Sequence, residues 1–161
     1  MLLYSLLAVQ RASAVPCASS TVQKLNVRNS AEAQALARAV ACEGGSFDII
    51  WSADVLLNQT ISISSSTTVN IRAAPEQEAV ISGGGTVRLF DFVGNGTLYL
   101  EGLVLRDGFV QGSGGAVNAA VPGSFLSLKD CTFLNNTARE NTRSHSCSVL
   151  VQAVEHRRGF K

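Results

Sequence analysis

The 161-residue sequence has little charge for its length. Charged residues make up 16% of the chain, below the roughly 25% that is typical of soluble domains. The formal net charge is +1, which gives no reason to expect binding to nucleic acid or to an acidic membrane surface. Low charge combined with many Gly, Ser, Thr and Asn residues indicates a β-rich body with many turns.

Histidine and the common catalytic motifs are missing from most of the chain. Both histidines, His145 and His156, lie in the C-terminal tail, so no histidine of the body can act as a base or a metal ligand. The sequence has no CxxC pair, no Cys/His spacing suited to zinc and no GxSxG motif. It therefore points to no catalytic residue, no metal and no cofactor.

The chain begins with an apolar run over residues 1–9 that is too short to span a bilayer, which takes about 20 residues. A small-x-small site, Ala12-Ser13-Ala14, follows it. This pattern is typical of a secretory signal peptide cleaved after Ala14, so residues 1–14 are a predicted signal peptide. No Lys or Arg precedes the run, and the alternative is the trimmed start of a mis-annotated gene.

Three sequons also favour an extracellular or cell-surface location. Asn58, Asn95 and Asn135 each begin an Asn-x-Thr motif, the acceptor pattern for N-glycosylation. All three lie where the sequence predicts turns, so an attached sugar would point outward.

The cysteines are even in number, which after a signal-like start is compatible with disulfides. We expect Cys17 to pair with Cys42, which would tie the mature N-terminus to the end of the first helix. Cys131 occupies a slot that Leu103 fills in a repeat described below, so we interpret it as a buried thiol that acts as a small hydrophobe. The sequence assigns no partner to Cys131 or Cys147.

One amphipathic helix is predicted near the N-terminus, over residues 30–42. Asn29 is a capping residue with Glu32 three positions later. The apolar residues that follow fall on one face at helical spacing, and Gly44 and Gly45 end the helix.

Only strand patterns follow the helix, and two of them form a repeat. Residues 97–108 align without a gap on residues 125–136, so Leu98 falls on Leu126 and Leu105 on Phe133. Alternation at period two is a strand signal, and a fixed period of 20–50 residues is typical of a solenoid. Earlier short strands are predicted over residues 22–27, 47–51, 60–63, 68–72, 79–82 and 87–93.

Short strands at regular spacing are also compatible with a sandwich or barrel, but the ungapped 28-residue repeat favours a parallel β-helix. The predicted fold is therefore an all-β solenoid over residues 15–138. In such a fold Leu98 would stack on Leu126 and Leu105 on Phe133. The helix would cover the N-terminal end, because a terminal coil needs a cap.

The C-terminal tail, residues 139–161, differs from the body because the β pattern stops at Ala138 and the composition becomes more basic. We interpret the chain as truncated, either a fragment or a product whose tail comes from a frameshift or an alternative exon. The alternative is a genuine tail that is partly disordered.

A short motif resembles a known repeat. Gly114-Gly115-Ala116-Val117, followed by Cys131-Thr-Phe-Leu-Asn-Asn136-Thr-Ala138, is similar to the GGAI…FxxNxA repeat of polymorphic outer membrane proteins. It is also similar to a broader set of pectin-lyase-like surface proteins. The resemblance covers residues 30–138 and implies a right-handed parallel β-helix. It gives Gly114, Gly115 and Asn136 structural roles: φ > 0 at tight turns for the glycines, and backbone hydrogen bonding at a coil corner for Asn136.

Two functions are weighed. The first is a non-enzymatic structural, adhesive or carbohydrate-associated module whose partner is a glycan or a cell-surface protein, with Tyr99 as an outward residue able to stack on a sugar. The alternative is a partial or degenerate polysaccharide lyase or hydrolase, which would need clustered carboxylates. No two acids of the body stack on neighbouring coils in the repeat register, and proximity among Asp91, Asp107 and Asp130 would favour the enzyme.

Overall fold

The computed structural model describes residues 22–42 and 44–139. The predicted signal peptide, Cys17, and tail residues 140–161 with Cys147 lie outside the described residues. Among the described residues the structure has one helix, α1 (Ser30–Val40), and the strands β1 (Gln23–Val27), β2 (Ser46–Trp51), β3 (Val55–Leu56), β4 (Ile61–Ile63), β5 (Thr68–Ala73), β6 (Ala79–Ser82), β7 (Phe90–Phe92), β8 (Thr97–Glu101), β9 (Leu103–Arg106), β10 (Phe109–Gln111), β11 (Val117–Asn118), β12 (Phe125–Lys129), β13 (Thr132–Leu134) and β14 (Thr137–Arg139).

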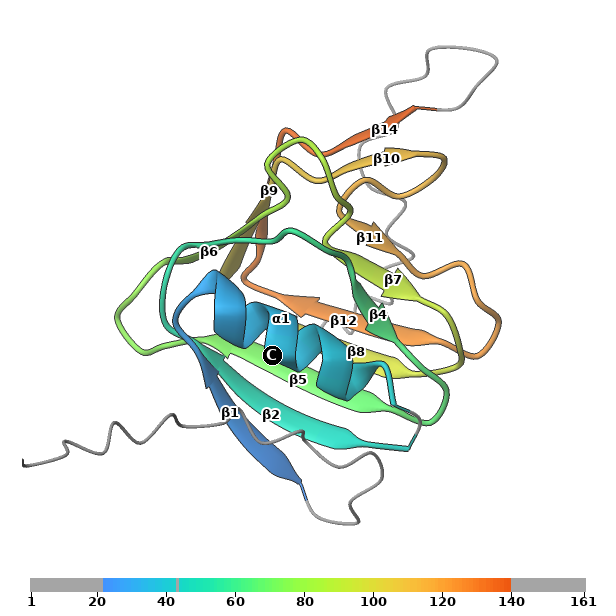
Figure 1. The fold of residues 1–161 in the computed structure, drawn as a ribbon, viewed down its shortest axis with the longest axis horizontal. Helices are drawn as coiled ribbons and strands as arrows, with labels where there is room; N and C mark the ends of the chain where they lie inside the picture. The colour runs from blue at the N-terminus through green and yellow to red at the C-terminus, as the bar shows by residue number, and fades with distance from the viewer. Residues whose placement is uncertain (1–21, 43, 140–161) are drawn as a thin grey trace, which may run out of the picture.

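The strands form parallel sheets whose neighbours come from successive coils of the chain (Figure 1). Sheet A has the order β1-β2-β5-β8-β12, sheet B β3-β6-β9-β13, sheet C β4-β7-β11, and sheet D β10-β14. Every strand pair in them is parallel. The chain is thus a parallel β-solenoid of about 4 turns, which confirms the predicted fold class.

The register of the coils matches the repeat found in the sequence. Leu126 lies opposite Leu98, and Phe133 lies opposite Leu105. The preceding coil is in phase, because Val69 lies opposite Leu98 on its other side. Side chains of Val69, Leu98 and Leu105 are fully buried, so the core is a stack of apolar residues that runs through the solenoid.

Helix α1 closes the N-terminal end of this stack. It packs against β1, β3 and β4, which are the first strands of sheets A, B and C. Its start is capped as predicted, since the Glu32 N–H donates to Asn29 Oδ1 at 2.9 Å. At its end the hydroxyl of Ser64 donates to Ala41 O at 2.8 Å, which satisfies a carbonyl that the helix leaves unpaired. The helix ends at Val40, two residues before the predicted boundary.

Strand β7 is shorter than the predicted strand over residues 87–93. The N–H groups of Leu89 and Phe90 both donate to the carbonyl of Ala116, at 3.1 and 2.9 Å. Two successive donors on one acceptor bend the chain, so regular pairing begins only at Phe90.

In the described part of the chain no helix is long and apolar enough to cross a membrane.

Candidate functional site

The outer surface of sheet A carries the residue that the sequence singled out for glycan contact. Tyr99 in β8 is 41% exposed and alternates with Leu98 and Leu100, which are buried. Its neighbours across the sheet are Asn70 in β5 and Ser127 in β12. The structure therefore places the Tyr99 ring on an open face between two polar side chains.

A second aromatic residue, which the sequence analysis did not select, lies beside Tyr99. Phe125, at the start of β12, is 45% exposed, and its ring centroid lies 5.6 Å from that of Tyr99 with the planes tilted by 54°. Phe125 pairs with Thr97, so it is the diagonal neighbour of Tyr99, within reach of an aromatic side chain. The 28-residue register would have been sufficient to find this pair. We call Tyr99 and Phe125 the aromatic platform.

Charged side chains near the platform are mostly matched within the sheet. Asp48 Oδ2 lies 3.3 Å from Arg72 Nη2, and Lys129 is paired with Glu101. The hydrogen bond to the Glu101 carboxylate raises the pKa of Lys129 above its ordinary value. Because each carboxylate is engaged by a cation, the surface around the platform suits a neutral polar ligand better than a polyanion.

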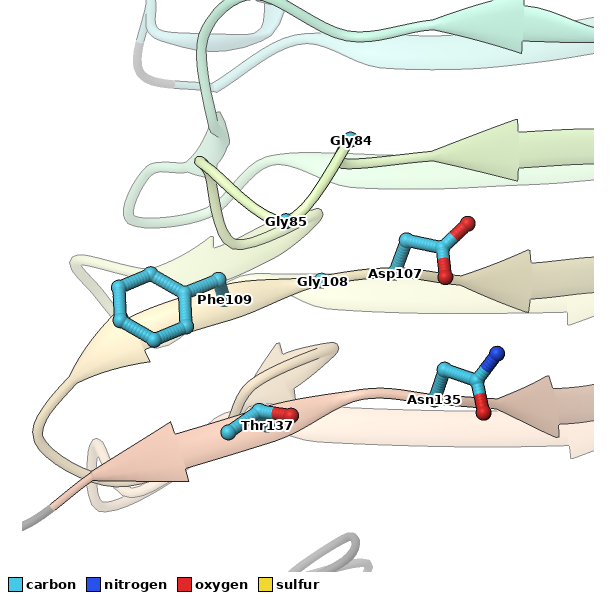
Figure 2. Close-up of a pocket in the computed structure, with 7 residues that line it drawn as sticks. All are labelled: Gly84, Gly85, Asp107, Gly108, Phe109, Asn135 and Thr137. Carbon is cyan, nitrogen blue, oxygen red and sulfur yellow. The ribbon is translucent and has the colours of Figure 1, made fainter.

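A cleft lies at a different place, at the corner where sheet B leads into sheet D. We call it the corner cleft; its volume is about 360 Å³ and it is lined by Gly84, Gly85, Asp107, Gly108, Phe109, Asn135 and Thr137. Figure 2 shows Asp107 and Asn135 on successive coils with their side chains pointing the same way, while Phe109 lies at the other end. Both residues adopt left-handed backbone, with φ of 52° and 53°, a region that Asn and Asp tolerate.

Asn136 joins two coils at this corner through its side-chain amide. Its Oδ1 accepts from the Gly108 N–H at 2.8 Å, and its Nδ2 donates to the Leu105 carbonyl at 2.9 Å. Both bonds satisfy backbone groups of the preceding coil, the kind of role that the sequence analysis assigned to this residue.

The two glycines of the predicted repeat motif serve different needs. Gly114 has φ of +75°, which glycine adopts without strain. Gly115 is not among the residues with positive φ, so the expectation of φ > 0 is wrong for it. Instead a Cβ at Gly115 would lie 2.5 Å from the Thr137 carbonyl oxygen, and glycine is needed because two coils approach closely.

The three sequon asparagines, Asn58, Asn95 and Asn135, are exposed at the surface and lie outside regular strands. Asn95 Oδ1 accepts from the Ser66 N–H at 3.3 Å, and Asn135 is also a lining residue of the corner cleft. Exposure is what N-glycosylation requires, and the modification itself stays a prediction.

The cysteine predictions separate into two kinds. Cys17 lies outside the described residues, so its pairing with Cys42 stays a prediction. Cys131 is a free, partly buried thiol that packs against the core. Burial raises the pKa of Cys131, which agrees with its interpretation as a small hydrophobe.

The acids that could favour an enzyme lie on different parts of the solenoid. Asp91 is in β7 of sheet C, where it pairs with Arg88 at 2.7 Å. Asp107 follows β9 of sheet B, and Asp130 lies between β12 and β13. Among the described residues no group of three or more His, Cys, Asp or Glu side chains could hold a metal ion. The placement of these acids gives no support to the lyase or hydrolase alternative.

Comparisons with protein-family models, curated proteins and solved structures found no match for the chain. The solenoid architecture therefore rests on the strand pairing described above. What the chain binds has to be inferred from its surface.

Proposed function

We propose that the chain is a secreted or cell-surface, non-enzymatic β-solenoid module that binds glycans on the outer face of sheet A. We also propose that it is related to the polymorphic outer membrane protein repeats and the pectin-lyase-like surface proteins that its Gly114–Val117 and Cys131–Ala138 segments resemble. The single observation that carries the binding proposal is the aromatic platform. Tyr99 and Phe125 are 41% and 45% exposed, on an outer face whose other residues are mostly polar.

The platform has the two properties that carbohydrate binding needs. Two exposed rings form an apolar surface on which the C–H face of a sugar can lie. Aromatic side chains suit this contact because each buries a large apolar area. Asn70, Thr97 and Ser127 border Tyr99 or Phe125 in the register, and they provide both donors and acceptors for sugar hydroxyls. Because these groups also bind water, the resulting contact would be a wet interface of modest affinity.

The flat shape of the sheet favours an extended partner over a compact one. Parallel strands lie about 4.8 Å apart, so polar side chains recur along the solenoid axis at a regular spacing from β2 to β12. A glycan chain, or a glycosylated surface protein, can contact several coils at once. This repetition fits an adhesive or structural role.

The test is binding of neutral oligosaccharides by the full chain, first on a glycan array and then by calorimetry with the best glycan. We expect Tyr99→Ala to weaken binding at least tenfold, which corresponds to about 1.4 kcal/mol. The matched control is Val93→Ala, since Val93 is 59% exposed but lies in the turn after β7 and belongs to no strand of sheet A. Equal binding by Tyr99→Ala and Val93→Ala, or no glycan bound at all, would refute the proposal.

A further inference from the structure

We propose that the corner cleft is a second binding site, independent of the aromatic platform, that takes a single neutral sugar ring. It is formed by residues of three successive coils, partly in the turns after β6, β9 and β13 and partly in strands β10 and β14 of sheet D, whereas the platform lies on sheet A. The proposal goes beyond the platform function because neither site needs the other.

The size of the cleft limits the ligand to something small. Its volume of about 360 Å³ is at the lower end of the roughly 300–1,000 Å³ found for small-molecule pockets. Gly85 lines the cleft, and an added Cβ at this position would meet nothing within 4 Å. A ligand can therefore approach the Gly85 backbone without displacing a side chain.

The lining combines groups that bind hydroxyls with one aromatic ring. Asp107 offers carboxylate oxygens and Thr137 a hydroxyl, which together can accept and donate several hydrogen bonds. The Asn135 amide adds a further donor and acceptor only in a chain whose Asn135 sequon carries no N-glycan. Phe109 supplies an apolar wall, and the guanidinium carbon of Arg139 lies over one side of its ring, 5.7 Å from the ring centre. This mixture suits a ring that has both hydroxyls and a C–H face.

The electrostatics disfavour a charged ligand. Asp107 Oδ2 lies 3.1 Å from Arg106 Nε and accepts from Ser82 Oγ at 3.4 Å, so much of its charge is matched within the protein. A carboxylate has about four lone-pair sites, and these two contacts leave room for further hydroxyl donors. The charge that stays unmatched on the carboxylate disfavours an anion. Among the described residues Asp107 belongs to no group of three His, Cys, Asp or Glu side chains that could hold a metal cation.

Saturation-transfer NMR with glucose, galactose, mannose and N-acetylglucosamine, each added separately, tests the proposal. The protein is made in bacteria, so that Asn135 carries no N-glycan. A sugar has only about a dozen non-hydrogen atoms, so its Kd is expected near 1 mM. We expect at least one of the four to bind.

Two near-isosteric variants, Asp107→Asn and Thr137→Val, are expected to raise the Kd at least fivefold. Val93→Ala is the control, since Val93 is 59% exposed and belongs to neither site, and it should leave the Kd unchanged. Circular dichroism of each variant shows whether it is folded. The proposal is overturned if no sugar binds at about 10 mM, if folded Asp107→Asn and Thr137→Val both bind normally, or if Tyr99→Ala abolishes the signal. Because the platform is tested with oligosaccharides and a different variant, either proposal can fail alone.

Discussion

Two neighbouring coils place nearly the same side chains in the same slots but bury them to different degrees. We number the coils by their strand in sheet A, so that β2, β5, β8 and β12 begin the first to the fourth coil. In the third coil Leu98, Leu100 and Leu105 are 0%, 1% and 0% exposed. In the fourth coil the residues stacked on them, including Leu126 and Phe133, are only partly buried. Within residues 22–42 and 44–139 nothing stacks on the outer side of the fourth coil. The difference fits the rule that burial in a solenoid depends on having a coil on each side, since one coil cannot cover its own inner face.

The N-terminal end demonstrates the same rule from the opposite direction. Ile49 and Trp51 belong to the first full coil, yet both are 0% exposed. They are covered because β1 pairs with β2 and α1 packs over the first strands. A helix can thus replace a missing coil, provided that its own apolar face points into the stack.

Leucine truncation should give the largest contrast between the two coils. We expect Leu98→Ala to lower the free energy of unfolding by about 2–5 kcal/mol, because it leaves a cavity with packed neighbours on both sides. Leu126→Ala should cost about 1 kcal/mol, because part of that side chain already contacts water. Urea unfolding followed by circular dichroism measures both, and equal losses would contradict the comparison.

The amide link between the same two coils should have the next largest effect. Asn136→Ala removes the partners of the Gly108 N–H and the Leu105 carbonyl, and we expect a loss of about 1–3 kcal/mol. Asn95→Ala is the control, since the Asn95 bond to the Ser66 N–H is longer, 3.3 Å, and exposed. Thermal unfolding of both variants checks this, and a loss no larger than that of Asn95→Ala would contradict the role given to Asn136.

At the capped end the expected effect is smaller. Asn29→Ala removes the acceptor for the Glu32 N–H, which typically costs about 1 kcal/mol. Gln34→Ala in the same helix is the control, since alanine has a higher helix propensity and no cap is lost. Chemical unfolding of the two variants distinguishes the loss of a cap from a general effect on α1. If Asn29→Ala left the free energy of unfolding unchanged, the cap would not stabilise the N-terminus of the helix.

The smallest expected effect concerns the fourth coil and is a change in the reactivity of the Cys131 thiol. Because burial raises the pKa of Cys131, its thiolate should form at higher pH in the folded protein than in urea. Iodoacetamide labelling across pH, with the Cys131 peptide followed by mass spectrometry, measures this directly. A midpoint at or below that of the unfolded chain would show that the slot is more open than the structure indicates.

The sequence predicted what depends on periodicity and missed what depends on stacking. The Leu98–Leu126 register was visible because an ungapped repeat fixes which side chains align. Strands β3, β10, β11 and β14 were missed, since each has only two or three residues and lies outside the two repeat copies and the clearly alternating runs. They pair because a neighbouring coil presents its backbone. Strand β7 was predicted too long because nothing in its residues shows that two donors share the Ala116 carbonyl.

The candidate sites divide in a similar way. The outward position of Tyr99 follows from alternation with Leu98 and Leu100, so it could be predicted. The corner cleft could not, because it depends on left-handed turns at Asp107 and Asn135 and on the space beside Gly85. Turn geometry of this kind is set by the coils on either side, so the residue types alone predict it poorly.

Because α1 covers the N-terminal end of the stack, local unfolding of the solenoid should start at the opposite end of the described residues. In a chain of units that contact only their neighbours, fluctuations begin where the fewest contacts must be broken. Within the described residues, the partly buried fourth coil is that place, and α1 protects the opposite end. Backbone amides should therefore exchange with solvent deuterium progressively more slowly from β12 through β8 to β5. The aromatic platform has one ring on β8 and one on β12. It therefore spans the boundary between the fourth coil, which is expected to open first, and the third coil, which is expected to stay folded.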